Sequence, residues 1–453
     1  MFSESPPPHS REPRGRVHLL IGVKPASTSA ADAEQIALDC GRVLSRHDIS
    51  DVECIVQEAT VSRLVTGPTG EYQMPGHGKP DEASSGATPL STLGSGADSG
   101  PVQDSDGLGS AISASNIGSY GTKGLYLDVT DSEEKTSKVA LTCRHVAIPD
   151  ELKLDESLAF QHGLSTLRTS QVPISQMSDE QLQYEKRLDN LSKTMRDLMG
   201  SQGPLNDLEQ CELRRVSHEI SHIEPIVTQL RLLPRPVGHV AFAPPLEVVA
   251  LTPTSNWPVD WAIVALDPTM HRTDLSTLSN SVSVQLSNDV RDTVLASFRE
   301  DDLGDDLPTG VMPLRGIISE EEIWSCHDYK DLVVAKYGAT TGLTYGVSNN
   351  FLSFTHQETS QSVKIIEEWS VIGMRDLTPG AARTRIDFSA PGDSGSCVWD
   401  ARNGRIGGQL RAGAVWESLA GGHVVGPVDV TYITPIARIL ADMNRHGLTV
   451  STP

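Results

Sequence analysis

The spacing of apolar residues predicts a small α/β unit near the N-terminus. Val17–Val23 is a continuous apolar run, which predicts a buried strand. Apolar residues then recur at the helical i, i+3, i+4, i+7 spacing over Ala33–Leu44, and Asp51–Gln57 predicts a second strand. A sheet this small leaves a face open, so we expect residues 17–65 to form an accessory module that packs on another part of the chain.

The segments on either side of this module have no such pattern. Residues 1–16 are rich in Pro, Ser and Arg, and residues 66–116 consist mostly of Gly, Ser, Pro, Ala, Thr and Asp. Neither segment carries enough apolar surface to offset the entropy lost on ordering. We therefore expect a disordered tail over 1–16 and a flexible linker over 66–116.

The rest of the chain, residues 117–453, is dominated by short β-rich runs. Gly124–Val129 and Lys138–Thr142 are β-rich and enclose a polar turn, which predicts a hairpin. From Val237 onward similar runs alternate with Gly, Pro and Asn. The pattern favours a mainly β body.

One stretch inside this body has a helical pattern instead. Ser178 with Gln181 forms a capping-box sequence, after which apolar residues repeat every three or four positions until Gly200. A second such repeat follows and contains Pro225, which is expected to kink it at a cost of up to about 3 kcal/mol. We expect an antiparallel helical hairpin over 176–232, inserted in the β body and a candidate surface for self-association.

Charge and composition narrow the class of partner. The chain has 37 Lys plus Arg and 59 Asp plus Glu, a formal charge of −22, which disfavours binding to nucleic acid or anionic membranes. No run approaches the roughly 18 apolar residues of a transmembrane helix, and residues 1–16 lack the apolar core of a signal peptide. The six cysteines are widely scattered, unlike a disulfide framework, so we expect reduced thiols in a cytoplasmic protein.

The pentapeptide from Gly392 to Ser396 (GDSGS) is a candidate nucleophile site. A catalytic serine needs a sharp turn that exposes its hydroxyl and aims backbone N–H groups at the developing oxyanion. The glycines on both sides of Ser394 allow such a turn. His145 lies at the end of a predicted strand, and Asp260 immediately precedes an apolar run. A serine, a base and a carboxylate that orients the base are the parts of a catalytic triad.

In the motifs T-x-x-H-V, D-x-A and G-D-S-G-S, taken in this order, the chain resembles the trypsin-like (chymotrypsin-fold) serine proteases. It is most similar to intracellular trypsin-like proteins of fungi, among them the processing protease of the yeast amino-acid sensor. Tyr337–Gly346 resembles a late barrel strand of these proteins, and Tyr432–Ile436 resembles the lead-in to their terminal helix. The resemblance spans roughly Gly118–Asn444 without the helical insertion.

The resemblance implies two antiparallel six-stranded β-barrels, and it assigns a role to each motif residue. Ser394 is then the nucleophile, His145 the general base and acid, and Asp260 the residue that orients His145. The backbone N–H groups of Gly392 and Ser394 form the oxyanion hole. The implied function is a serine endopeptidase that forms an acyl-enzyme intermediate and uses neither a cofactor nor a metal; the alternative is a catalytically silent scaffold that binds partners.

The resemblance also bears on the substrate. In trypsin-like enzymes the floor of the specificity pocket lies six residues before the nucleophile, a position that Phe388 occupies here. A Phe cannot pair with a buried cation, so we expect a protein or peptide substrate with an apolar or small residue at the cleavage point. A register shift of one residue would bring Asp387 into the pocket and reverse this expectation. The chain's own N-terminal region is a further candidate substrate, through cleavage in the linker over 66–116.

Four other features were weighed against more ordinary interpretations. His218-Glu219-Ile220-Ser221-His222 matches the zinc-protease motif H-E-x-x-H, but no suitable third ligand follows it, and the motif fits a polar helix face. Asp267 is the second candidate for the triad carboxylate, although Pro268 indicates a turn there. Cys397 fits a buried side chain, and the acidic run Asp301–Asp306 fits a solvated loop.

Overall fold

The computed structural model describes residues 17–64, 107–114, 119–130, 134, 136–148, 173–200, 206–231, 235–252, 255–271, 273–285, 307–325, 332–358, 363–375, 385–417 and 429–451. The chain divides into two compact units. The first comprises Met1–Thr60 and Ala414–Val428, and the second comprises Val61–Gly413 and Asp429–Pro453. None of the helices in the described ranges combines the length and apolar content needed to cross a lipid bilayer.

The first unit contains the predicted strand, helix and second strand. Strands β1 (Val17–Val23) and β2 (Val52–Arg63) pair in parallel, and helix α1 (Ala30–Arg46) connects them. The prediction that β1 is buried is wrong, because its residues are exposed or half-buried, as fits a strand at the edge of its sheet. The helix likewise keeps part of its apolar stripe in solvent, with Val43 51% exposed. Strand β2 is longer than predicted and crosses into the second unit at Val61.

The second unit is mainly β and contains a closed six-stranded antiparallel barrel, in which each strand pairs with the next and the last with the first. The resemblance predicts Tyr337–Gly346 as one strand, whereas the structure divides this segment between β14 (Val333–Gly338) and β15 (Gly342–Ser348). A tight turn separates the two strands, and Gly342, the first residue of β15, has a φ of +65°. The terminal helix α9 (Ile436–Arg445) follows the barrel directly, as predicted. The barrel strands in ring order are β14, β15, β17 (Val363–Arg375), β21 (Asp429–Pro435), β20 (Ile406–Glu417) and β19 (Cys397–Asp400).

A second, eight-stranded sheet lies in the same unit. Its β5 and β6 form the predicted hairpin, with Leu125 opposite Leu141. Pairing between its outermost strands, β22 and β4, is absent from the described ladders, so a second closed barrel stays a prediction. In sheet order the strands are β22 (Thr449–Ser451), β5 (Leu125–Thr130), β6 (Thr136–Thr142), β11 (Ala262–Leu266), β8 (Arg235–Phe242), β7 (Pro173–Gln176), β3 (Ala111–Ala114) and β4 (Gly121–Thr122).

Strand β3 lies in a region that the sequence analysis assigned to the linker. The structure instead places Ala111–Ala114 in the eight-stranded sheet, between β4 and β7, with Ile112 buried. Backbone pairing on both sides stabilises this strand although its side chains are mostly small. Most of the predicted linker, including residues 66–106, and the predicted tail, residues 1–16, lie outside the described residues.

Smaller elements complete the described chain. Two strands pair with β17 alone, and two further pairs form short ladders. These strands are β16 (Ser353–Glu358) and β18 (Arg385–Ile386) beside β17, β9 (Glu247–Thr252) with β10 (Ser255–Val259), and β12 (Ser281–Val284) with β13 (Gly310–Pro313). The short helices are α2 (Arg144–Ala147), α8 (Glu320–Trp324), η4 (Pro268–Met270) and η5 (Leu275–Thr277).

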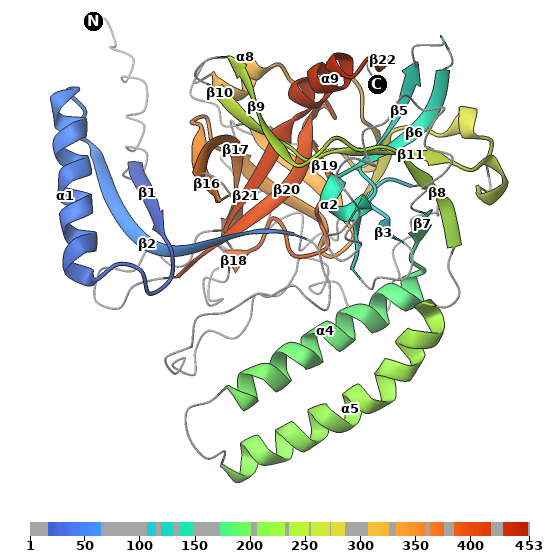
Figure 1. The fold of residues 1–453 in the computed structure, drawn as a ribbon, viewed down its shortest axis with the longest axis horizontal. Helices are drawn as coiled ribbons and strands as arrows, with labels where there is room; N and C mark the ends of the chain where they lie inside the picture. The colour runs from blue at the N-terminus through green and yellow to red at the C-terminus, as the bar shows by residue number, and fades with distance from the viewer. Residues whose placement is uncertain are drawn as a thin grey trace, which may run out of the picture. The chain divides into compact units, whose positions relative to one another are not determined.

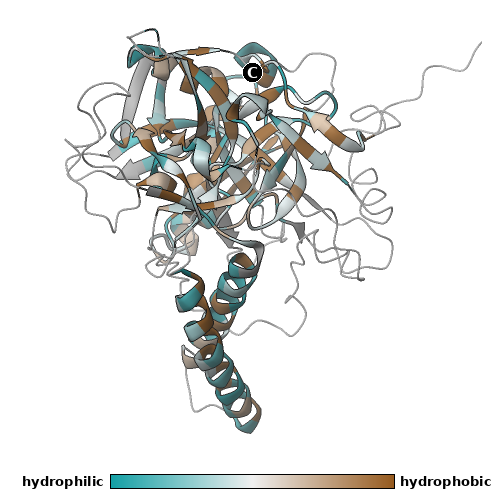
Figure 2. Cartoon of the chain, turned by 90° about the vertical axis from the view of Figure 1, so that its right-hand side faces the viewer, coloured by the Kyte–Doolittle hydropathy of each residue, from teal (hydrophilic) through white to brown (hydrophobic). Residues whose placement is uncertain are grey.

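The predicted helical hairpin consists of α4 (Asp179–Met199) and α5 (Asp207–Arg231), which run side by side away from the strands of this unit (Figures 1 and 2). The Ser178 side chain caps α4 by accepting a hydrogen bond from the Gln181 N–H at 3.1 Å. Apolar residues fill the seam between the helices, while the outward faces are largely hydrophilic (Figure 2). The seam contains Tyr184, Leu188, Leu191, Met195, Val216, Ile220, Ile223 and Val227.

Replacing residues 179–231 by a short Gly/Ser linker is expected to leave both β-sheets folded. The hairpin joins β7 to β8, and these neighbouring strands pair in register with Gln176 opposite Arg235, so a short loop can close the gap. The seam is internal to the hairpin and is lost together with it. Circular dichroism and thermal unfolding, run beside the full-length chain, check this result. An insoluble product, or one without a cooperative transition, would show that the hairpin is required for folding of the β body.

Candidate active site

His145 and Asp260 are brought together by strand pairing. His145 lies in helix α2, which starts two residues after β6 ends at Thr142. Asp260 lies in the short link between β10 and β11. Strands β6 and β11 are antiparallel with Ala262 opposite Thr142, so the two side chains emerge at the same end of this ladder. One strand pair therefore brings together two residues that are 115 positions apart in the sequence.

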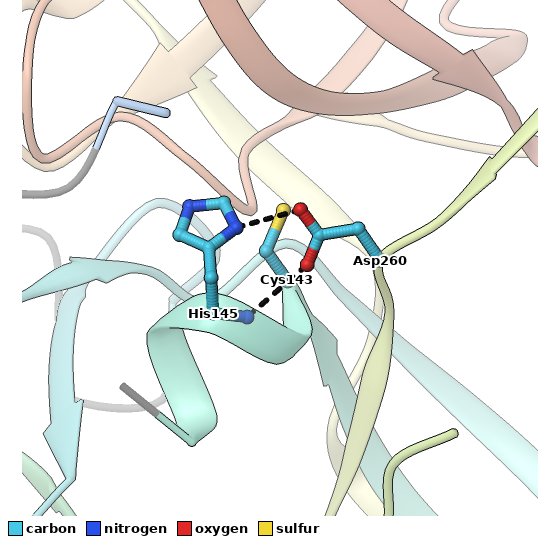
Figure 3. Close-up of side chains that lie close together, drawn as sticks. All are labelled: Cys143, His145 and Asp260. Atoms are coloured by element: carbon cyan, nitrogen blue, oxygen red, sulfur yellow. Dashed lines mark hydrogen bonds and ion pairs between the residues drawn. The ribbon is translucent and has the colours of Figure 1, made fainter. Parts of the chain in front are cut away.

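Two hydrogen bonds connect these residues. The His145 Nδ1 atom lies 2.7 Å from Asp260 Oδ2, and the His145 backbone N–H donates to Asp260 Oδ1 at 3.1 Å (Figure 3). Both side chains are 2% exposed. Burial alone raises the pKa of Asp260, but the hydrogen bond and charge of His145, together with Arg63 and Arg411, hold that pKa below its usual range. Asp260 therefore stays a carboxylate and fixes the orientation of the His145 ring.

Ser394 lies on a glycine-flanked turn just before barrel strand β19. Gly392 and Gly395 have φ values of +100° and +97°, which residues other than glycine rarely adopt. The Ser394 hydroxyl donates to the Arg411 carbonyl at 2.9 Å. His145 Nε2 is buried, with no hydrogen-bond partner among the described residues. Nε2 is the ring nitrogen that a general base would use.

A shared acceptor links the histidine and serine parts of the site. The Leu410 carbonyl accepts from the Cys143 thiol at 3.2 Å and from the Gly395 backbone N–H at 2.8 Å. Cys143 is two residues before His145, and Gly395 directly follows Ser394. Leu410 of β20 therefore contacts both the segment that leads into His145 and the turn that carries Ser394.

Two backbone N–H groups of the serine turn converge on one oxygen. The Gly392 N–H and the Ser394 N–H donate to the carbonyl oxygen of Leu64 at 2.7 and 3.1 Å. These are the two donors that the sequence analysis assigned to an oxyanion hole. Leu64 directly follows β2 and belongs to the second unit. Sequence reasoning missed Leu64, since nothing in its local pattern marks it as part of a site.

Asp393 holds this turn through a buried network that the sequence analysis also missed. Asp393 Oδ2 accepts from the Lys336 ammonium at 3.1 Å, and both side chains are fully buried. Asp393 Oδ1 accepts from the Thr340 and Thr341 N–H groups at 2.8 and 3.2 Å, which fixes the turn between β14 and β15. Burial lowers the pKa of Lys336, and the charge of Asp393 opposes this shift. A lysine in the otherwise uncharged strand Val333–Gly338 was the available sequence signal.

A second buried ion pair lies behind Ser394. The Arg411 guanidinium bonds to Glu368, and the Arg411 carbonyl accepts the Ser394 hydroxyl. Burial raises the pKa of Glu368, and Arg411 partly offsets this shift. Burial alone lowers the pKa of Arg411, but Glu368 and Asp260 together raise it. The Arg411 guanidinium thus interacts electrostatically with both Glu368 and Asp260.

Cys143, His145 and Asp260 also form a cluster whose potential ligand atoms lie within 4.8 Å of one another (Figure 3). The cluster does not fit a metal site well. Burial raises the pKa of the Cys143 thiol well above its usual value, whereas a metal binds the thiolate. The His145 Nδ1 atom is already bonded to Asp260. The donor set fits an oriented histidine base with a neutral neighbouring thiol.

Phe388, the predicted floor of the specificity pocket, is fully buried. It belongs to an apolar cluster with Leu64, Leu410 and other residues of the closed barrel. The neighbouring Asp387 is only half-buried and lies outside this cluster. The side chain of Phe388 therefore lies in the apolar core of the closed barrel, and its role in a specificity pocket stays a prediction.

The remaining predicted features lie elsewhere. His218 and His222 are exposed on α5, and Glu219 pairs with Arg187 and Arg215, as fits a polar helix face. Asp267 caps the η4 turn by accepting from the Thr269 N–H at 2.9 Å. Cys397 is buried, which raises the pKa of its thiol. Five of the six cysteines lie in the described ranges, and all five are free thiols: Cys40, Cys54, Cys143, Cys211 and Cys397. Cys326 and Asp301–Asp306 lie outside the described residues.

Comparisons with known proteins add little to this geometry. No protein-family model and no curated protein matches the chain. Among solved structures, it matches a glutamic-acid-specific serine protease that uses a novel histidine triad in substrate binding, at 12% identity and a TM-score of 0.28. The match covers 76% of this chain and 99% of that protein. A likeness this low carries no argument about fold or activity.

Proposed function

We propose that this chain is a serine endopeptidase that hydrolyses peptide bonds through an acyl-enzyme intermediate. Ser394 is the nucleophile, His145 the general base and acid, and Asp260 the carboxylate that orients His145. The Gly392 and Ser394 N–H groups bind the oxyanion. The same proposal includes a chymotrypsin-like arrangement of two barrels. It also includes a cytoplasmic location and a relationship to the intracellular trypsin-like proteins of fungi.

The reaction begins when the Ser394 hydroxyl leaves the Arg411 carbonyl and donates to His145 Nε2 instead. The exchange replaces one hydrogen bond, which contributes about 1 kcal/mol net, by another of similar kind. As Ser394 Oγ attacks a carbonyl carbon, its proton passes to His145, and the Asp260 carboxylate stabilises the imidazolium. His145 then protonates the leaving amine. Water deacylates the enzyme by the same path in reverse.

The observation that supports this function best is the convergence of the Gly392 and Ser394 N–H groups on one carbonyl oxygen, at 2.7 and 3.1 Å. Donors held at this distance stabilise the negative charge of a tetrahedral intermediate. They lie on the residue that carries the nucleophile and on its near neighbour. Beside them, the His145–Asp260 pair leaves Nε2 unpartnered among the described residues.

A fluorophosphonate probe is expected to label Ser394. Because the Leu64 carbonyl occupies the two N–H donors, labelling is measured both in the wild-type chain and in Leu64→Glu, whose buried charge disfavours this occupancy. Ser394→Ala in either background is expected to abolish labelling. Peptide mapping by mass spectrometry identifies the labelled residue, and thermal unfolding confirms that each variant is folded.

The alternative, a silent partner-binding module, is favoured by one observation. The Ser394 hydroxyl donates to a backbone carbonyl rather than to His145. A silent module predicts that the probe fails to label Ser394 in both the wild-type and the Leu64→Glu backgrounds although the chain is folded. Labelling in the Leu64→Glu background alone supports the protease and shows that Leu64 obstructs the site.

A further inference from the structure

The oxyanion donors of this site are occupied by the chain itself. The acceptor is the Leu64 carbonyl, at 2.7 Å from the Gly392 nitrogen and 3.1 Å from the Ser394 nitrogen. In the proposed reaction this is the position of the carbonyl oxygen of the residue under attack. A backbone segment that enters the site by chance would not be expected to satisfy both donors at once.

The Leu64 side chain also lies in a defined apolar environment. It is 6% exposed and packs in the cluster that contains Phe388, Trp369 and Leu410. On β20, a Cβ atom at Gly413 would lie 3.2 and 3.3 Å from the two Leu64 methyl carbons, a tight contact. The lack of a side chain at Gly413 therefore provides room for a leucine.

The residues before Leu64 form a strand next to β20. Strand β2, which ends at Arg63, lies beside β20 in the sheet order. An extended segment added to a strand beside the nucleophile is a common mode of peptide recognition.

We propose that the peptide bond between Leu64 and Val65 is a substrate of this chain's own site, and that the site selects leucine at the attacked position. The proposal rests on the proposed function and adds the bond and the specificity. It places the cut one residue before the segment in which the sequence analysis expected self-cleavage. Covalent tethering raises the effective concentration of this bond to the millimolar range.

The reaction at this bond is balanced by the residues present and one water. Ser394 Oγ bonds to the Leu64 carbonyl carbon while its proton passes to His145 Nε2. The carbon–nitrogen bond to Val65 breaks, and His145 returns the proton to the new Val65 amine. Water then gives one proton to His145 Nε2 while its oxygen bonds to the Leu64 acyl carbon. The bond from that carbon to Ser394 Oγ breaks, and His145 returns the proton to Oγ, which restores the Ser394 hydroxyl and releases a Leu64 carboxyl group.

Intact mass and N-terminal sequencing of the purified full-length chain test the proposal. Wild type is expected to yield two pieces, one ending at Leu64 and one beginning at Val65. Ser394→Ala is expected to stay intact. Leu64→Glu is expected to stay intact at this bond, because a buried charge is costly, whereas the similar-sized Leu64→Met is expected to be cut. Gly413→Val, which crowds Leu64, is expected to slow the cut at least tenfold while the fold persists in thermal unfolding.

Several results would overturn the proposal. A wild-type chain that stays intact although the probe labels Ser394 would remove self-cleavage and leave the protease function standing. An intact chain without labelling in the Leu64→Glu background would remove both. Cutting at another bond, or cutting after residue 64 in Leu64→Glu as fast as in wild type, would remove the leucine assignment. A break that persists in Ser394→Ala would assign it to a contaminating protease.

A peptide library supplies an independent measure of specificity. The library is cleaved with the Leu64→Glu variant, in which Gly413 is unchanged. Cleavage after leucine is expected to exceed cleavage after Lys, Arg or Glu at least tenfold. Cleavage mainly after a charged residue would overturn the leucine assignment even where the chain cuts itself.

Discussion

Asp260→Asn is expected to lower kcat for peptide hydrolysis by about 10⁴-fold while the chain remains folded. The Asp260 carboxylate accepts from the His145 ring at 2.7 Å and from the His145 backbone N–H at 3.1 Å. An amide group keeps the size but loses the negative charge, and its NH₂ can turn His145 into the wrong tautomer. The general base is then lost although the local geometry is retained.

The measurement uses a peptide substrate chosen from a library, in the Leu64→Glu background, in which the Leu64 carbonyl is expected to leave the two N–H donors. The matched control is Asp267→Asn, which alters the other candidate carboxylate. Asp267 caps the η4 turn, and Asn caps turns about as well as Asp, so kcat and thermal stability are expected to stay near their original values. Equal losses of kcat in the two variants, or full activity in Asp260→Asn, would contradict the assignment of Asp260.

Lys336→Met is expected to lower the stability of the folded protein and the rate at which a fluorophosphonate labels Ser394. It removes the cation that lies 3.1 Å from Asp393 and leaves a fully buried carboxylate without its charge partner. Breaking such a pair from one side costs about 3–5 kcal/mol. Asp393 lies between the two oxyanion donors, so its displacement is also expected to slow fluorophosphonate labelling by about 10²–10³-fold, the effect of losing one donor.

Lys138→Met is the control for loss of a lysine ion pair. Lys138 lies 2.9 Å from Asp128, whose side chain is 45% exposed, so this pair in the β5–β6 hairpin contributes about 0–1 kcal/mol. Thermal unfolding measures the stability change, and the labelling rate of folded protein measures the effect on the site. Adding Asp393→Asn to Lys336→Met removes the unpaired charge and is expected to restore part of the stability. Similar small effects in the two lysine variants would show that Lys336 has no special role.

Several secondary-structure elements were predicted correctly from local sequence patterns. The seam of α4 and α5 was visible because apolar residues repeat every three or four positions, a property that a helix turns directly into one face. The β5–β6 hairpin was likewise visible from two β-rich runs and a polar turn. The same reasoning misjudged the burial of β1, because a run of apolar residues shows that a strand forms but not which strands lie at an edge.

By itself the sequence determined the candidate triad, since His145, Asp260 and Ser394 each lie in a short motif that is recognisable without contacts. Only the tertiary structure decided what surrounds them. Lys336 meets Asp393 across 57 residues and Arg411 meets Glu368 across 43, and such pairs leave no periodic signal because each depends on strand order in the barrel. The placement of Leu64 on the oxyanion donors depends on β2 lying beside β20, which local sequence does not encode.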